Sequence, residues 1–363
     1  MRIVTNNTAD CGSALLAGSP AQSVRTPISP PAAIRRDNAS LSIILCTSNR
    51  AESLAQTLAA LNCLIVPQGM NVELIVVDNN SQDHTASIFR EFAPSRLRPR
   101  MVIERRPGLS YSRNAGIAES SGEIVLFTDD DVRPPPNWID GMCTPIVTGL
   151  ADAVAGGVTL APHLVKPWMD PMHLIWFAAT PGPDGAVPDA MVGANMAFSR
   201  DVLRRVPGFD VELGAGALGY MEETLFSLQL KRAGYRLVSR YQIAVEHHFD
   251  ANRLKKATLI EAAAKRGRSS AYIHHHWEHR RFPLAHLHMK RKALSIACAR
   301  TDENNSGEGV SPKLLHDLRS LHLYHHCIQL ASDPRNYDAF GMIKIRGKGI
   351  VRSLTRNGCL VRL

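Results

Sequence analysis

The chain has 363 residues, of which 45% are hydrophobic and 21% charged, values typical of a soluble globular protein with one large domain or two medium ones. It has no apolar run of about 18 residues and no signal-peptide pattern, so we expect no membrane span. Its seven scattered cysteines form no CxxC pair, so we expect neither a zinc site nor a disulfide framework and predict free thiols in a reducing cytosol. The net charge of +9 arises in residues 253–292, which hold eleven Lys or Arg and two acidic residues.

The first half of the chain alternates between strand-like and helix-like segments. Residues 1–38 are rich in Ser, Ala, Pro and Thr and lack periodicity, which predicts a disordered tail. Strands that alternate with helices indicate a parallel sheet with helices on both faces. The predicted strands are 42–46, 72–77, 101–103 and 123–127, and the predicted helices are 51–61, 85–92 and 112–119.

After residue 136 the pattern becomes mixed. A helix is predicted at 222–233, and residues 163–180 are interpreted as an apolar loop that contains Trp. Beyond His248 the chain is basic and helical, with a polar linker at 301–311 and a further helix at 312–331. The predicted strands of this part are 152–160, 191–198, 235–238 and 243–245.

The basic segment 253–292 has three interpretations: contact with an anionic membrane surface, binding of a polyanionic or lipid-diphosphate acceptor, or a solvated helical face. We favour peripheral membrane contact, because several Lys and Arg side chains together attract anionic lipids. We expect no nucleic-acid partner, since the segment lacks the interleaved aromatic residues of a single-strand binder.

Polar clusters follow three of the predicted strands, at residues 47–50, 78–80 and 129–131. In open α/β sheets, ligands bind beyond the carboxyl ends of the strands, so we expect these clusters to meet at one edge. Three successive carboxylates repel one another unless a cation compensates them, and Mg²⁺ or Mn²⁺ with a phosphate-bearing substrate fits such a cluster. The alternative is a solvated acidic turn.

Seven motifs in order make residues 41–249 resemble the inverting nucleotide-sugar glycosyltransferases of family 2, which have the glycosyltransferase A fold. Each motif is weak alone, whereas their order and spacing together are specific. The motifs lie at 43–50, 73–81, 108–116, 128–131, 193–198, 222–235 and 245–247.

The resemblance implies a nucleotide pocket lined by Thr47, Asn49 and Arg50. It also implies that Asp78 accepts a hydrogen bond from an N–H group of the base, the alternative being an Asx turn after the strand. Arg113 is expected either to contact the diphosphate of the sugar donor or to brace its helix.

The resemblance further implies a DxD element at Asp129 and Asp131, with Asp130 between them, all three beside the nucleotide sugar. The last acid would bind a divalent metal, Mn²⁺ or Mg²⁺, and the first would contact the ribose or a metal-bound water. His247 stands where the family often supplies another metal ligand. Neighbouring His248 leaves that assignment open, and the alternative is a histidine that merely ends a strand.

Inversion requires a general base for the acceptor hydroxyl, and the family usually offers Glu-Asp at a helix start. This chain has Glu222 and Glu223 there, with Glu223 at the Asp position. Adjacent helical residues point about 100° apart, so only one of them should face the acceptor. The alternative is a pair of solvated acids favoured by the helix dipole.

The sequence thus predicts an α/β protein with the glycosyltransferase A fold, a Rossmann-like mixed sheet flanked by helices, and a helical, basic C-terminal extension. We expect a cytoplasmic enzyme, peripheral to the inner face of the membrane, that transfers a sugar from a nucleoside-diphosphate sugar to a glycan or lipid-linked acceptor. The expected units are a tail (1–38), a catalytic domain (39–250) with nucleotide-binding (39–136) and acceptor-binding (137–250) halves, and the extension (251–363).

Other functions fit the sequence less well. A nucleotidylyltransferase needs a Gly-rich, Arg-containing loop after the first strand, and a dehydrogenase needs GxGxxG there; neither is present. A degenerate transferase-like scaffold, or a basic protein that binds membranes or nucleic acid, would be the non-enzymatic alternative. The intact acids Asp78, Asp129, Asp131 and Glu223 argue against degeneration.

Overall fold

The computed structural model describes residues 39–94, 96–180, 182–303 and 309–348. The tail expected at 1–38 and the end of the chain beyond 348 lie outside the described residues. The described part forms one sheet of eight strands: β1 (Ser40–Thr47), β2 (Asn71–Asp78), β3 (Arg98–Ile103), β4 (Ile124–Asp129), β5 (Val132–Arg133), β6 (Ala153–Leu160), β7 (Asn195–Ser199) and β8 (Leu237–His247).

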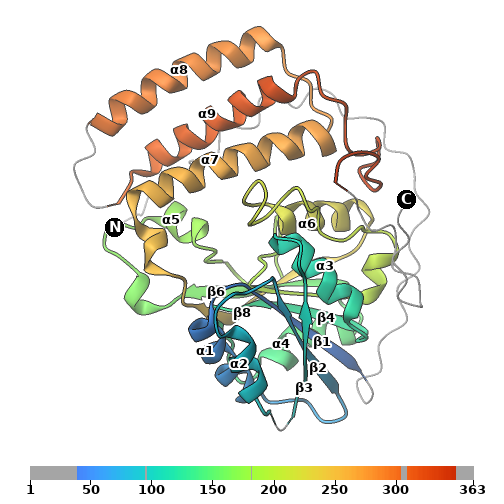
Figure 1. Cartoon of the computed structure of the whole chain (residues 1–363). Helices are drawn as coiled ribbons and strands as arrows, with labels where there is room; N and C mark the ends of the chain where they lie inside the picture. Colours follow the sequence, from blue (N-terminus) through green and yellow to red (C-terminus); the bar gives the residue numbers. More distant parts are fainter. Residues whose placement is uncertain (1–38, 95, 181, 304–308, 349–363) are drawn as a thin grey trace, which may run out of the picture. The chain divides into compact units, whose positions relative to one another are not determined.

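The strands lie in the order β3-β2-β1-β4-β7-β6-β8-β5 (Figure 1). From β3 to β4 all neighbours are parallel, as the sequence predicts. Beyond β4 the sheet is mixed, because β7 runs antiparallel to both β4 and β6, while β8 is parallel to β6 and antiparallel to β5. The predicted mixed α/β class is therefore confirmed.

Helices cover both faces of the sheet (Figure 1). Successive residues of a strand point to opposite faces, so Ile43 and Leu45 of β1 enter one hydrophobic core and Ile44 enters the other. Apolar side chains of α1 and α4 pack in the same core as Leu45. Apolar side chains of α3 and α6 pack in the same core as Ile44. The helices up to this point are α1 (Ala51–Asn62), α2 (Thr85–Glu91), α3 (Leu109–Glu119), α4 (Trp138–Val147), α5 (Pro171–Trp176) and α6 (Glu222–Arg232), with short 3-10 turns η2 (Pro162–Leu164) and η3 (Arg200–Arg204).

Gly116 sets the distance between α3 and the sheet. A Cβ atom at this position would overlap the side chain of Ile44 and crowd that of Val77 at 3.2 Å. Only a residue without a side chain lets the helix approach β1 and β2 so closely. Gly116 is therefore a close-packing residue between α3 and the sheet.

Two segments differ from the predicted pattern. The predicted strands 235–238 and 243–245 are one continuous β8, whose pairing with β6 shifts register between Gly156 and Gly157. The predicted loop 163–180 contains α5, because the Asp170 side chain accepts hydrogen bonds from the first-turn N–H groups of Met172 and His173 in a capping box.

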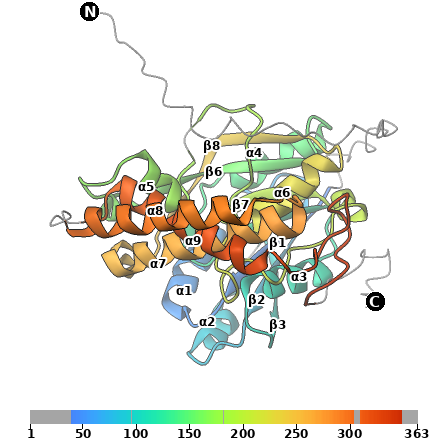
Figure 2. The ribbon, with the colours of Figure 1, turned by 90° about the horizontal axis from the view of Figure 1, so that it is seen from above.

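The C-terminal part is helical, as expected, and consists of η4 (Ala251–Leu254), α7 (Lys256–Tyr272), the π-helical turn η5 (Ile273–Trp277), α8 (Leu284–Glu303) and α9 (Pro312–Leu330). Both views show α9 beside α7 and α8 (Figures 1 and 2). Gly267 permits the close α7–α9 crossing, since a Cβ atom there would overlap the backbone of Arg319.

Within the described ranges, no helix combines the length and the apolarity needed to cross a lipid bilayer. The five cysteines that the structure describes are all free thiols, and Cys63 is the exposed one among them.

Candidate functional site

The polar clusters predicted from the sequence meet at the carboxyl end of the parallel strands. The β1–β2 register places Thr47 opposite Asp78, and the β1–β4 register places Cys46 opposite Asp129. Loop residues after β1, β2 and β4 are therefore neighbours in space, as the topology rule predicts.

Asp130 is buried and points back toward β1 and α1. Its carboxylate accepts hydrogen bonds from Thr47 Oγ1 at 2.8 Å and from Arg50 Nη1 at 3.0 Å, and its backbone carbonyl accepts from the hydroxyls of Ser53 and Thr57. Burial raises the pKa of Asp130 to about 6, although the Arg50 charge acts in the opposite direction. Asp130 thereby fixes the loop that carries the other two acids.

Asp131 faces His247 and Arg50. Its carboxylate lies 3.4 Å from His247 Nε2 and 2.9 Å from Arg50 Nη1. Pairing of β5 with β8 sets Val132 opposite His247, which brings the histidine to the acid. Burial acts to raise the pKa of Asp131, but the His247 ring and the Arg50 charge outweigh it and hold this pKa well below its usual range.

The Asp131–His247 pair fits a divalent metal. The Nδ1–H group of His247 donates to the carbonyl of Phe177 at 3.0 Å, which leaves Nε2 as the nitrogen that faces Asp131. Across the ranges that the structure describes, no group of three His, Cys, Asp or Glu side chains forms a complete metal cage. Two protein ligands suit Mg²⁺ or Mn²⁺ when substrate phosphates complete the coordination.

His248 does not share this position. Its Nε2 lies 2.6 Å from Glu246 Oε1, and its backbone N–H donates to the carbonyl of Asp131 at 2.7 Å. His247 is the last residue of β8, and His248 lies just beyond the end of that strand. The structure thus brings His247, and not His248, to the carboxylate of Asp131.

Arg113 connects the acid cluster to α6. Its side chain is buried, with Nη1 at 2.7 Å from Glu222 Oε1 and Nη2 at 3.6 Å from Asp129 Oδ1. Gly193 makes room for the guanidinium, because a Cβ atom at that position would overlap it. Of the two roles expected for Arg113, bracing is the one visible in these contacts.

Glu222 and Glu223 have different environments. Glu222 is held by Arg113, whereas Glu223 Oε2 is buried and has no hydrogen-bond partner among the described residues. Burial, together with the neighbouring Glu222 charge, raises the pKa of Glu223 to about 8. Glu223 thus combines a buried oxygen that lacks a hydrogen-bond partner in the described part of the chain with a raised pKa, a combination found among groups that transfer protons.

Asp78 and Asn49 join the loops after β1 and β2. The Asp78 carboxylate accepts from the N–H of Ser81, three residues further along the chain, at 2.9 Å, a local contact that differs from the Asx turn considered as an alternative. Asn49, at a φ of 52°, accepts from the N–H of Gln82 at 2.7 Å. Both residues therefore shape the loops at this edge of the sheet.

The motif at 193–198 has a structural function. Asn195 is buried, donates to the carbonyls of Gly157 and Ile243 at 2.8 Å each, and accepts from Trp138 Nε1 at 2.8 Å. It joins β6, β7, β8 and α4, and Trp138 lies in the core, the default for an isolated Trp.

Sequence reasoning missed Arg266 on α7, which it counted only as part of a basic run. Its guanidinium lies over the rings of Tyr220 at 4.2 Å and Trp176 at 5.0 Å. No local pattern links residues so far apart in the chain, so only the fold reveals the contact.

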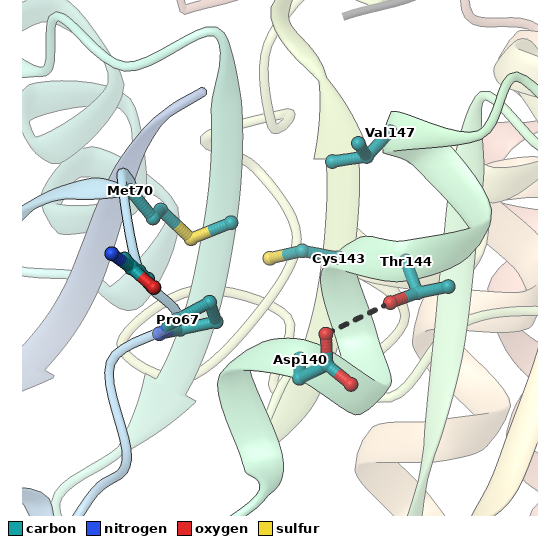
Figure 3. Close-up of a pocket in the computed structure, with 7 residues that line it drawn as sticks. Pro67, Met70, Asp140, Cys143, Thr144 and Val147 are labelled. Atoms are coloured by element: carbon teal, nitrogen blue, oxygen red, sulfur yellow. Dashed lines mark hydrogen bonds between the residues drawn. The ribbon is translucent and has the colours of Figure 1, made fainter. Parts of the chain in front are cut away.

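A cavity of about 210 Å³ lies elsewhere, between the turn before β2 and α4 (Figure 3). It opens at the amino end of β2, away from the edge where the acids gather. None of the candidate site residues lines it, so we assign the chemistry to the acid cluster and not to this cavity. Its lining residues are Pro67, Gln68, Met70, Asp140, Cys143, Thr144 and Val147.

Residues 42–206 match the family described as glycosyl transferase family 2. The match covers somewhat less than half of the chain and identifies that part as a glycosyltransferase family 2 sequence. One relative is the glycosyltransferase AglE of Haloferax volcanii, 38% identical over 120 residues that make up 32% of this chain and 39% of that protein. Another is the glucosyl-dolichyl phosphate glucuronosyltransferase of the same organism, 25% identical over 57% of this chain and 68% of that protein.

Among solved structures, a mannosyltransferase from Pyrobaculum calidifontis, in complex with GDP-Man and Mn²⁺, is 19% identical with a TM-score of 0.49, and the match covers 83% of this chain and 75% of that one. The mixed sheet flanked by helices, with its helical C-terminal part, is the glycosyltransferase A architecture expected for this family.

Proposed function

We propose that this protein is a metal-dependent inverting glycosyltransferase of family 2 that moves a sugar from a nucleoside-diphosphate sugar to a hydroxyl of a glycan or lipid-linked acceptor. The observation that carries the proposal is the position of Arg113, which contacts both Glu222 and Asp129. It holds the first turn of α6, with the unpartnered carboxylate of Glu223, beside the acid cluster. This arrangement supports the proposal, because a proton acceptor on α6 and a diphosphate-binding edge would then belong to one site.

The donor would lie across the ends of β1, β2 and β4. Thr47, Asn49, Arg50 and Asp78 would surround the nucleotide, and Arg113, Asp129 and Asp130 would position the sugar and diphosphate, directly or through the loops they fix. A divalent cation, Mn²⁺ or Mg²⁺, held by Asp131 and His247 would neutralise the charge that the diphosphate gains as the glycosidic bond breaks.

Glu223 would act as the general base. The proton of the acceptor hydroxyl passes to the Glu223 carboxylate while the hydroxyl oxygen bonds to the anomeric carbon. The bond from that carbon to the diphosphate oxygen breaks, its electron pair leaves with the nucleoside diphosphate, and the configuration inverts. Glu222 remains paired with Arg113 and keeps the base in place.

We further propose the division expected from the sequence, with a nucleotide-binding half at 39–136, an acceptor-binding half at 137–250 and an extension at 251–363. One relative is named as a glucosyl-dolichyl phosphate glucuronosyltransferase, and this name supports a lipid-linked acceptor for the present protein.

The extension would contact an anionic membrane from the cytoplasmic side through residues 253–292. On α8, the exposed Leu284 and Met289 accompany the exposed cations Lys290 and Lys292. Apolar side chains beside Lys are the combination that binds an anionic bilayer surface. Sedimentation with phosphatidylserine vesicles, but not with phosphatidylcholine vesicles, would support this contact, and equal sedimentation or none would oppose it.

The test of the activity is release of nucleoside diphosphate from UDP-, GDP- and dTDP-sugars with Mn²⁺ or Mg²⁺. We expect metal-dependent release from one donor, lost in Asp131→Ala. Glu119→Gln removes an exposed acid at the C-terminal end of α3, where it pairs with Arg100, and serves as the control. No release and no donor binding across the panel would contradict the proposal and favour a non-catalytic scaffold.

A further inference from the structure

Arg266 is a partly buried cation that forms no ion pair with an acid of the described residues. Its guanidinium lies over the rings of Tyr220 and Trp176, and its Nη2 donates to the carbonyl of Trp176 at 2.8 Å. Its Nε is buried without a hydrogen-bond partner among the residues that the structure describes. Buried polar groups are nearly always partnered, so this one calls for an explanation.

The contacts of α7 place Arg266 beside the candidate base. One turn further along α7, the hydroxyl of Ser270 donates a hydrogen bond to the backbone carbonyl of Arg266 at 2.9 Å. The same hydroxyl lies 3.4 Å from Met221 Sδ. Met221 directly precedes Glu222 and Glu223. The face of α7 that carries Arg266 therefore packs on Tyr220 and Met221, the two residues that directly precede α6.

A second arginine approaches the same place from α9. Arg319 Nη2 donates to Ser270 Oγ at 3.4 Å, and no carboxylate of the described residues pairs with Arg319. Burial lowers the pKa of Arg266, Glu223 opposes that effect, and the charges of Arg253 and Arg319 lower the pKa further. The positive charge gathered here is thus only partly balanced by the protein.

A purely structural function explains only part of this arrangement. The bond to Trp176 accounts for Nη2 of Arg266, but it accounts neither for the unpartnered Nε nor for the neighbouring arginines. A planar guanidinium in contact with two rings keeps its N–H groups, including the unpartnered Nε, in fixed directions, which suits a tetrahedral oxyanion. The free groups of Arg266 and of Glu223 are complementary to a substrate with both an anionic group and a hydroxyl.

We propose that Arg266, assisted by Arg319, binds a phosphate group of the acceptor, next to the carboxylate that takes the acceptor's proton. This assignment rests on the proposed function and adds the acceptor's chemical class, a phosphorylated molecule. The phosphate belongs either to a lipid or to a soluble phosphomonoester. The C-terminal helices would therefore complete the acceptor site.

The first test is binding of inorganic phosphate to the metal-free full-length protein by isothermal titration calorimetry. We expect Arg266→Gln to weaken binding about tenfold or more, and Arg266→Lys and Arg319→Gln to weaken it less. Lys265→Gln removes one charge from the position directly before Arg266 in α7, where Lys265 pairs with Glu261. This variant should bind phosphate as the wild type does. Unchanged affinity in Arg266→Gln, or an equal loss in Lys265→Gln, would overturn the proposal. If Arg266→Gln does not fold, unchanged affinity in both Arg266→Lys and Arg319→Gln would overturn it.

The second test distinguishes a lipid phosphate from a soluble phosphate ester. It also distinguishes failure of this proposal from failure of the proposed function. Glycerol 3-phosphate and phosphatidylcholine vesicles that contain a polyprenyl phosphate are compared as ligands of wild type and Arg266→Gln. Arg266-dependent binding of the vesicles alone indicates a lipid phosphate, Arg266-dependent binding of the soluble ester indicates a soluble one, and binding independent of Arg266 in both arms overturns the proposal. Failure of the proposed function is a separate result, since wild type would then release no nucleoside diphosphate while still binding phosphate.

Discussion

Arg113 and Glu222 form a buried ion pair, 2.7 Å between Nη1 and Oε1, that joins α3 to the first turn of α6. The side chains are 3% and 5% exposed, so neither charge has water as an alternative partner. This contact leaves Glu223 as the carboxylate with a free oxygen, and it distinguishes two adjacent acids that the sequence alone presents as equivalent.

Loss of one partner of this pair should be costly. We expect Arg113→Met to lower the free energy of unfolding by about 3–5 kcal/mol, because it leaves a buried carboxylate unpaired. The measurement is urea denaturation. Arg204→Met breaks the exposed pair with Asp201, whose side chains are 74% and 45% exposed, and should cost about 0–1 kcal/mol. Equal effects of the two substitutions would contradict the assigned importance of the buried pair.

The rate of transfer should depend on the ionisation of Glu223. A general base must be deprotonated, and burial raises the pKa of Glu223 to about 8, so we expect the rate to increase with pH through that range. A pH–rate profile of the wild type at saturating donor measures this. A rate that is already constant from pH 6 upward would show that Glu223 is ionised in the working enzyme or is not the base.

The same pKa predicts an effect on stability. A carboxyl whose pKa is higher in the folded state than its ordinary value of 4.5 stabilises the fold below that value, and this contribution is lost as pH rises through about 8. Relative to Glu223→Gln, the wild type should therefore become progressively less stable between these limits. Urea denaturation of both proteins from pH 5 to pH 9 tests this, and parallel pH dependences would contradict it.

Removal of His247 should weaken the metal site. We expect His247→Ala to require more Mn²⁺ for half-maximal release of nucleoside diphosphate, and Asp131→Ala to lower that release about 100-fold or more. EDTA should abolish the wild-type activity. The matched control is His248→Ala, because His248 bonds to Glu246, and its metal titration should resemble that of the wild type. The reverse order of the two histidine variants would reassign the ligand.

Gly116→Ala should disturb the packing of α3 on the sheet. The added methyl group overlaps Ile44, so we expect a loss of about 1–3 kcal/mol in the free energy of unfolding. The substitution Ile44→Ala should cost less in the Gly116→Ala background than in the wild type, because it makes room for the methyl group. Additive costs in this double-mutant cycle would show that the two positions do not compete for space.

The parallel half of the fold could be predicted from the sequence, because β1, β2 and β4 are short apolar runs buried on both faces and each ends in polar residues. The meeting of those ends at one edge followed from topology alone. The second half was harder, since β8 contains a register shift against β6 that divides its apolar pattern into two apparent strands.

Side-chain partners could not be predicted in the same way. The choice between His247 and His248 depends on the pairing of β5 with β8, and β5 is only two residues long. The contact of Arg266 with Trp176 joins residues 90 positions apart. Trp176 ends α5, a helix in a segment that the sequence pattern predicted to be a loop. Such contacts follow from packing and leave no periodic trace in the sequence.

The most direct test of the account compares Glu223→Gln with Glu222→Gln, using the donor that the sugar-nucleotide panel identifies. We expect Glu223→Gln to lower transfer about 100-fold to 10,000-fold with donor affinity unchanged, because the variant binds the donor but has no base. Glu222→Gln retains a carbonyl that accepts from Arg113 and should keep most of the activity. Full transfer by Glu223→Gln, with loss in Glu222→Gln, would contradict the central assignment and make Glu222 the base.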